Sequence, residues 1–359
     1  NQLELGLWME SERLLHPVIN QVGVDTQNGV IKEERRQTQD NRPYGNLISE
    51  VTRHLFPGTG YEHAIIGTIE DLDNATLEDF INFHTTYYVP NNAVLVVAGD
   101  FDKKQTKKWI QEYFAPIPKG APVERKDFKT REINQQIEGK FYDGNIQTPM
   151  MVLAYKTPPA NSREALVLDL ISSILSDGKS SRLSKKLVDD KKMALFVGAF
   201  NYALKNSGMY LIYGLPMGET TLDDLAREVD EEIQRLQKEL ISQRDYQKLM
   251  NQYENNFVQS NSTPEGIATS LATNHTMFGD ASRINSELEM YRSITIEEIQ
   301  EVARKYLNPN QRLFLRYLPE EEPQVVSEPE MNNVQSVAQP ETKNEEKSKK
   351  SKREKKKKK

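Results

Sequence analysis

The stretch TLEDFINFHTTYYVPNNAVLVV at residues 76–97 recurs in altered form as TIEEIQEVARKYLNPNQRLFLR at residues 295–316. Thr76 pairs with Thr295, which sets a constant offset of 219 residues. Each copy has Thr as the expected N-cap, acids in the first turn, an amphipathic helix, a Pro-Asn turn and an apolar run that predicts a strand. Two copies of one helix-turn-strand unit predict two related α+β domains in tandem.

The second copy has all the signals of a complete domain. These signals are a strand pattern at 150–155, a helix at 165–178, a strand at 208–216 and a long helical stretch at 222–258. Shifted back by the offset, the first of these strands falls before residue 1, and residues 3–39 take the place of the long helical stretch. We therefore expect the first copy to be incomplete, with roughly 70 to 80 of its residues lying upstream.

Composition divides the chain into four parts, which are 1–114 (the end of the first domain), 115–140 (a Pro- and Lys-rich linker), 141–318 (the second domain) and 319–359 (a tail). The tail carries six Glu in residues 319–342 and eleven Lys or Arg in residues 343–359. A segment so rich in charge is predicted to be disordered. It is either a solubilising end or a contact to an anionic surface, and the lack of interleaved aromatic residues weakens a specific nucleic-acid role.

The chain contains no cysteine, which excludes disulfides, thiolate metal sites and cysteine nucleophiles. Any metal must therefore be held by His, Asp or Glu. The sequence has no apolar run near the roughly 18 residues that a membrane-spanning helix needs.

A helix is predicted at 25–39, where Val30 and Glu34 lie four residues apart and so share a face. Glu34 could project from this face toward a site. The same pattern also fits an exposed, charged helix whose acids and arginines contact only solvent, so periodicity leaves both interpretations open.

Three stretches resemble the insulinase (pitrilysin) zinc metallopeptidases, in particular their compact bacterial and mitochondrial-processing branch. They are VIKEERRQTQDNRPYG (30–45), HAIIGTIEDLDNATLEDFINFHTTYYVPNNAVLVVAGDF (63–101) and LSDGKSSRLSKKLVDDKKMA (175–194). The resemblance extends over residues 1–318. It implies an α+β fold built from a tandem pair of two-layer α/β domains, of the LuxS-like metallopeptidase type, with the second domain inactive.

The resemblance also implies a site. Family members bind Zn²⁺ through two histidines of an HxxEH motif, whose Glu activates water, and through a Glu on a later helix. That later Glu matches Glu34 within VIKEE, with Glu33 as the alternative. None of the five histidines here begins an HxxEH motif, so the catalytic residues are expected upstream. Arg182 in GKSSRL and His63 are candidate contacts to substrate or partner, whereas Leu195 stands where the family often has a substrate-binding Tyr.

The expected function is zinc-dependent endopeptidase cleavage of peptides or small unfolded proteins. The expected partners are the peptide substrate and a second peptidase-like subunit or another copy of the chain, because the family encloses substrate between two such halves. The competing hypothesis is a non-catalytic partner subunit with the same fold. By the same resemblance, the periplasm of a Gram-negative bacterium is the favoured compartment.

Overall fold

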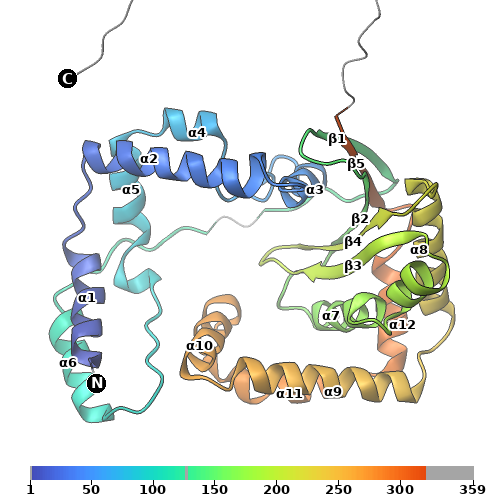
Figure 1. Ribbon diagram of the computed structural model, residues 1–359. Helices are drawn as coiled ribbons and strands as arrows, with labels where there is room; N and C mark the ends of the chain where they lie inside the picture. The colour runs from blue at the N-terminus through green and yellow to red at the C-terminus, as the bar shows by residue number, and fades with distance from the viewer. Residues whose placement is uncertain (1, 126–127, 321–359) are drawn as a thin grey trace, which may run out of the picture. The chain divides into compact units, whose positions relative to one another are not determined.

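The computed structural model describes residues 2–125 and 128–320 (Figure 1). Six α-helices precede the first strand in these residues, and five strands and six further α-helices follow. The elements are α1 (Leu3–Leu15), α2 (Gln21–Arg35), η1 (Arg36–Asp40), α3 (Leu47–Leu55), α4 (Ile69–Asn74), α5 (Leu77–Tyr87), η2 (Pro90–Asn92), α6 (Lys103–Phe114), β1 (Ile137–Asp143), β2 (Met150–Thr157), α7 (Arg163–Ser176), η3 (Ser184–Asp190), β3 (Ala194–Tyr202), β4 (Gly208–Pro216), α8 (Leu222–Lys238), α9 (Gln243–Ser260), α10 (Pro264–Phe278), η4 (Ala281–Asn285), α11 (Glu287–Arg292), α12 (Ile296–Tyr306) and β5 (Arg312–Pro319).

The five strands form one sheet in the order β1-β5-β2-β4-β3. The β1–β5 pair is parallel and the other pairs are antiparallel. The central strand β2 is apolar at nearly every position, as expected for a strand that is covered on both faces. The α+β class predicted from the sequence is confirmed.

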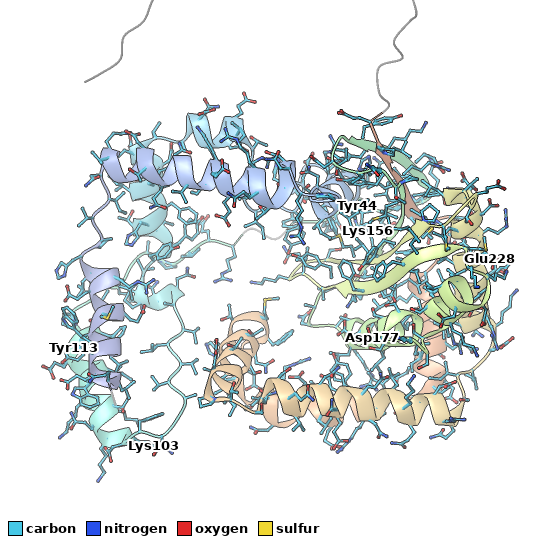
Figure 2. All side chains as sticks on the ribbon, in the orientation of Figure 1. Tyr44, Lys103, Tyr113, Lys156, Asp177 and Glu228 are labelled. Atoms are coloured by element: carbon cyan, nitrogen blue, oxygen red, sulfur yellow. The ribbon has the colours of Figure 1, made fainter. Side chains whose placement is uncertain are left out.

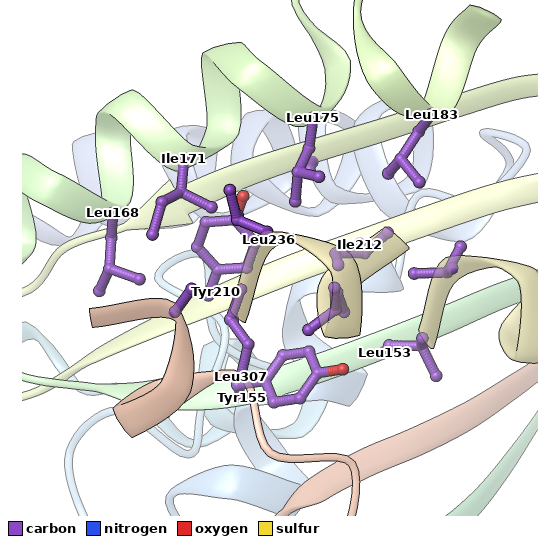
Figure 3. Packing of buried hydrophobic residues seen from close by; sticks show 14 of the residues in the cluster. Leu153, Tyr155, Leu168, Ile171, Leu175, Leu183, Tyr210, Ile212, Leu236 and Leu307 are labelled. Carbon is purple, nitrogen blue, oxygen red and sulfur yellow. The ribbon is translucent and has the colours of Figure 1, made fainter. Parts of the chain in front are cut away.

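Helices α7, α8 and α12 cover one face of the sheet (Figure 3). Side chains that alternate along β2, such as Leu153 and Tyr155, point into this layer and meet Ile171 and Leu175 of α7. All four are fully buried. This layer is the main hydrophobic core of the second copy.

The opposite face of the same sheet is covered by α3, which lies in the first part of the sequence. Val51 and Leu55 of α3 pack on Val152 of β2 and Leu315 of β5, and all four are buried. Tyr44, labelled in Figure 2, precedes this helix with a positive φ of 59°. Its backbone N–H donates to the Asp143 carboxylate at 3.1 Å and its hydroxyl donates to a backbone carbonyl at 2.7 Å. Residues up to 320 therefore form a single compact unit.

Helices in the two parts of the chain follow the same order at the offset of 219 residues. Helices α1 to α5 correspond to α8 to α12, and each shifted start lies within three residues of its counterpart. Both α5 and α12 begin with a capping box, formed by Thr76 with Asp79 and by Thr295 with Glu298. The repeated segment thus has the same local structure in both places.

The strand predicted after the first Pro-Asn turn is absent from the described residues, so that prediction is wrong. Residues 93–98 belong to no helix or strand and have no neighbouring strand among the described residues, whereas their counterpart β5 is paired on both sides. A strand requires partners for its backbone groups. The side chains differ accordingly, since Leu95 is 46% exposed and its counterpart Phe314 is 3% exposed.

The segment between the two parts is shorter than predicted. Helix α6 ends at Phe114 and β1 begins at Ile137, which lies inside the predicted linker of 115–140. Nearly all of the predicted tail lies outside the described residues.

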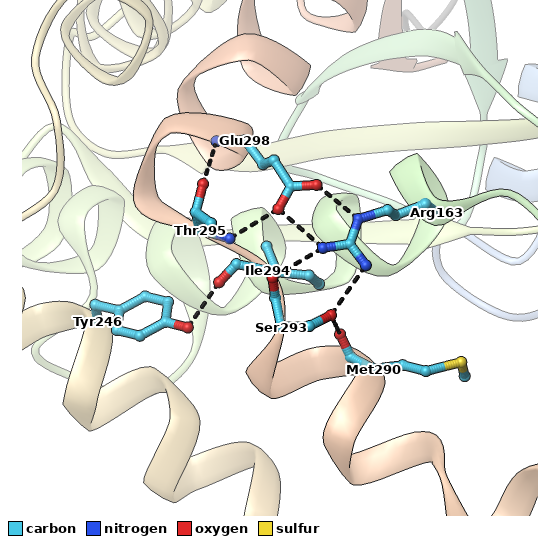
Figure 4. A network of polar contacts seen from close by, with 7 residues as sticks. All are labelled: Arg163, Tyr246, Met290, Ser293, Ile294, Thr295 and Glu298. Atoms are coloured by element: carbon cyan, nitrogen blue, oxygen red, sulfur yellow. Dashed lines mark hydrogen bonds and ion pairs between the residues drawn. The ribbon is translucent and has the colours of Figure 1, made fainter.

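Arg163 ties the start of α7 to the start of α12 (Figure 4). Its guanidinium donates to both carboxylate oxygens of Glu298, at 2.6 and 2.9 Å, and to the hydroxyl and carbonyl of Ser293, at 3.0 and 2.9 Å. Glu298 also accepts the backbone N–H of Thr295 at 2.8 Å. One arginine therefore supports the cap of the repeated helix.

We expect Arg163→Met to lower the free energy of unfolding by about 1 kcal/mol, because several charge-assisted hydrogen bonds are lost at a half-exposed position. Urea denaturation measures the change. Arg292→Met is the matched control, because the Arg292 side chain forms ion pairs with two exposed acids, Glu254 and Glu289. It should cost under about 0.5 kcal/mol. Equal losses in the two variants would contradict a special role for Arg163.

Candidate metal ligand and substrate-contact residues

Glu34 lies near the end of α2, on the side of that helix away from its packing partners. The packed side carries Asn28, whose amide donates to the carbonyl of Leu72 at 2.6 Å. It also carries Lys32, which pairs with Asp73 of α4. Glu34 is exposed to solvent. Its neighbour on that side, Val30, is 54% exposed.

The two adjacent glutamates of α2 have different surroundings. The Glu33 carboxylate accepts from Gln37 at 3.0 Å and from Arg36 at 3.3 Å, and these hydrogen bonds lower its pKa. The Glu34 side chain makes no hydrogen bond or ion pair with any described residue, and only its backbone carbonyl is engaged, by the Thr38 hydroxyl at 2.7 Å. Glu34 is therefore the carboxylate of this pair that has no partner among the described residues.

The segment after Glu34 is held firmly. It continues as the π-helical turn η1, a feature often found near functional sites. Arg35 contacts Asp40 at 3.2 Å, and the Asp40 carbonyl accepts from Asn145 at 2.8 Å. These contacts fix the end of α2 against the second copy, so the helix that carries Glu34 has a set position.

The counterpart of Glu34 in the second copy is Tyr253 of α9, which cannot replace a carboxylate ligand. Its hydroxyl donates to Glu287 at 2.8 Å and its ring stacks on Tyr291. The Tyr291 hydroxyl donates to Asp169 of α7 at 2.9 Å, and burial raises the pKa of this carboxyl. In the second copy the equivalent position is therefore part of an internal hydrogen-bond network.

The end of α2 contacts the loop that contains His63, because Arg35 donates to the carbonyl of Gly67 there. The cavity lined by Arg182 contains no residue of either region. His63 is exposed in the loop before α4 and contributes to lowering the pKa of Asp71, a shift caused mainly by hydrogen bonds from Thr68. Arg182 lies at the start of the helical segment that contains η3 and lines a cavity of about 520 Å³. Leu195, at the position where the family often has Tyr, is 55% exposed on β3.

Residues 2–125 and 128–320 contain no group of three or more His, Asp or Glu side chains that could hold a metal ion. A catalytic zinc site needs three protein ligands. These residues therefore do not form a zinc site by themselves, and Glu34 is a single candidate ligand.

Ser181 and Lys248 line the same cavity as Arg182, although neither was predicted as a site residue from the sequence. Ser181 adjoins Arg182 in the chain, but Lys248 comes from α9, more than sixty residues later. No sequence signal joins that helix to GKSSRL, so only the fold brings these residues together.

The sequence model described as "Peptidase M16 inactive domain" matches residues 74–253. The match runs from α5 of the first copy to α9 of the second and covers half of the chain. The chain therefore belongs to the peptidase M16 family, as the resemblance predicted. Glu34 lies outside the matched segment.

Particular relatives agree with this family. The chain is 24% identical over 287 residues to "Zinc protease PqqE" of Helicobacter pylori, covering 79% of this chain and 64% of that protein. The crystal structure of a protease from Helicobacter pylori matches with a TM-score of 0.82 at 21% identity, covering 89% of this chain and 77% of that one. The first half of the periplasmic protease PqqL from Escherichia coli matches with a TM-score of 0.68 at 16% identity, covering 88% and 70%.

These comparisons show an insulinase-like fold and relatives that are named zinc proteases. The chain spans less than two thirds of the length of the Helicobacter pylori relative. No helix in the described ranges is long and apolar enough to cross a membrane.

Proposed function

We propose that this chain belongs to a zinc metalloendopeptidase that cleaves peptides or small unfolded proteins, and that Glu34 is one of its zinc ligands. The observation that carries the proposal is the unengaged carboxylate of Glu34 at the fixed end of α2, beside the occupied carboxylate of Glu33. In zinc peptidases the bound ion polarises the substrate carbonyl and lowers the pKa of its water. The remaining ligands would come from an HxxEH helix outside residues 1–359.

Exposed apolar side chains of the first copy support the proposal that further structural elements pack on it. Phe83 of α5 is 57% exposed and its counterpart Val302 is 7% exposed, while Tyr88 is 54% exposed and its counterpart Leu307 is fully buried. Apolar side chains at these matched positions are covered by the sheet layer in the second copy. We propose that strands and a helix preceding residue 1 cover them in the first copy.

The description of the matched family segment as inactive favours a second candidate function, a non-catalytic subunit of a peptidase pair. In that case HxxEH would be absent from the complete reading frame. A working enzyme would instead keep HxxEH in the first copy and use the second copy, with Tyr253 in place of a ligand, to hold substrate. In either case we propose a peptide as ligand, a second peptidase-like subunit or a second copy of the chain as partner, and the periplasm as compartment.

We expect residues 1–359 alone to bind no stoichiometric zinc and to cleave no peptide, because one carboxylate cannot replace three ligands. Metal analysis after dialysis against zinc, and cleavage of an unfolded substrate with and without chelator, measure the two properties. The protein expressed from its complete reading frame is the positive control and should show both. If residues 1–359 alone bound stoichiometric zinc and cleaved peptide in a chelator-sensitive way, the proposal that the other zinc ligands lie outside these residues would be wrong.

A further inference from the structure

The cavity lined by Arg182 contains buried polar groups that have no partner. Ser181 is 4% exposed, and its hydroxyl oxygen is buried without a hydrogen-bond partner among the described residues. The Nη1 atom of Arg182 is also buried and has no hydrogen-bond partner among the described residues. Buried polar groups are rarely left unsatisfied, since each costs about 1 to 3 kcal/mol. A bound group with acceptor oxygens would satisfy both.

The cavity is also positive where these groups lie. Lys248 donates to the hydroxyl of Ser180 at 2.6 Å and keeps further ammonium hydrogens free for other acceptors. Lys185 is exposed on the rim and forms no ion pair with a described residue. Burial lowers the pKa of Arg182, while the charges of Glu232, Asp245 and Glu239 act in the opposite direction.

Three carboxylates line the cavity as well, and two of them have partners of their own. Glu232 contacts Lys186 at 3.6 Å. Asp245 accepts from the Ser242 hydroxyl at 2.8 Å within the first turn of α9. The third, Asp190, is exposed. None of them forms an ion pair with Arg182, so the guanidinium remains available.

We propose that this cavity binds an oxyanion, either a carboxylate or a phosphate, through the guanidinium of Arg182, the hydroxyl of Ser181 and the ammonium of Lys248. Arginine matches the paired oxygens of such groups by two parallel hydrogen bonds. The volume of about 520 Å³ exceeds that of the anion, so the rest of a larger ligand, such as the last residue of a peptide, also fits. The proposal does not depend on zinc or on peptidase activity.

The test uses the protein expressed from its complete reading frame, at constant ionic strength. The readouts are Tm and calorimetric titration. Inorganic phosphate, a peptide with a free C-terminal carboxylate and the same peptide as its C-terminal amide are the three probes. We expect a saturable rise in Tm with phosphate, with the free-acid peptide, or with both, and no rise with the amide or with chloride. A response to phosphate alone would identify a phosphate site, and a response to the free acid alone would identify a peptide carboxylate site.

Arg182→Met is the informative variant, because it keeps the bulk of the side chain and removes the charge. We expect it to weaken anion binding about tenfold or more, the equivalent of one charge-assisted hydrogen bond. Without anion it should be about as stable as wild type, since the charge removed is partly buried and forms no ion pair with a described residue. Lys179→Gln is the control, because it removes the same charge from an exposed residue that does not line the cavity.

A purely structural Arg182 would give the opposite pattern. Arg182→Met would then lower Tm in the absence of anion and leave the anion response of the folded protein unchanged. Ser181→Ala provides a second check that does not alter charge, and we expect it to fold normally and to bind the anion more weakly. The proposal is wrong if wild type shows no saturable response to any probe, or if Arg182→Met and Lys179→Gln respond as wild type does.

Discussion

Glu34→Gln, made in the protein expressed from its complete reading frame, is expected to lose zinc and peptidase activity together. The substitution keeps size and helix but replaces a charged oxygen ligand by a neutral amide. Changes in the outer shell of a metal site already cost about 10- to 100-fold, so loss of a ligand should cost more than about 100-fold. Because Glu34 is exposed and its side chain has no partner among the described residues, Tm should fall only by the stabilisation that zinc provides.

Glu33→Gln is the matched control, since it makes the same chemical change one residue earlier on α2. Its carboxylate is occupied by Gln37 and Arg36, and it points about 100° away around the helix. We expect it to keep both zinc and activity. Reversed phenotypes would identify Glu33 as the ligand, and unchanged metal content in both variants would contradict a ligand on α2.

Local sequence signals were sufficient for much of the fold. The strand predicted at 208–216 is β4 with the same bounds, and the strand predicted at 150–155 lies within β2. The N-caps predicted at Thr76 and Thr295 form, each as part of a capping box. These features depend on residues close together in sequence, so composition and spacing are enough to find them.

Features that depend on distant residues were not predicted. Residues 93–98 have the pattern of a strand, but a strand forms only when a neighbour pairs with it, and the described residues supply none. One local signal was missed as well, because the helical stretch predicted at 222–258 is two helices, α8 and α9, and Ser242 caps the second of them. The packing of α3 on the sheet of the second copy is likewise a contact between segments that no local pattern connects.

The candidate site also combines features that local sequence signals predict with features that depend on contacts between distant residues. The position of Glu34 on a helix followed from spacing, but its difference from Glu33 depends on which neighbour turns toward which carboxylate. Arg182 was recognised by its motif, yet its cavity needs Lys248 from α9. Motifs therefore located candidate residues, and the fold determined which of their polar groups are left without partners.

Asp230→Ala is expected to be among the most destabilising changes at a polar position of the second copy. Asp230 of α8 accepts two hydrogen bonds from Arg312 of β5, the longer at 3.0 Å, and the Arg312 side chain is only 5% exposed. Arg312 also donates to Tyr155, whose pKa burial raises to about 12, which indicates surroundings that disfavour additional charge. Removing Asp230 leaves a buried guanidinium without its counter-charge, at a cost of about 3 to 5 kcal/mol of unfolding free energy.

A second pair between the same strand and helix provides the control. Arg316 of β5 pairs with Asp223 of α8 at 2.6 Å, but Asp223 is 66% exposed. Solvent screens that charge, so Asp223→Ala should cost under about 1 kcal/mol in the same urea titration. Combining Arg312→Met with Asp230→Leu should recover most of the loss, because an apolar pair leaves no charge unpaired. Equal costs for Asp230→Ala and Asp223→Ala would show that burial of Arg312 does not set the strength of the contact between β5 and α8.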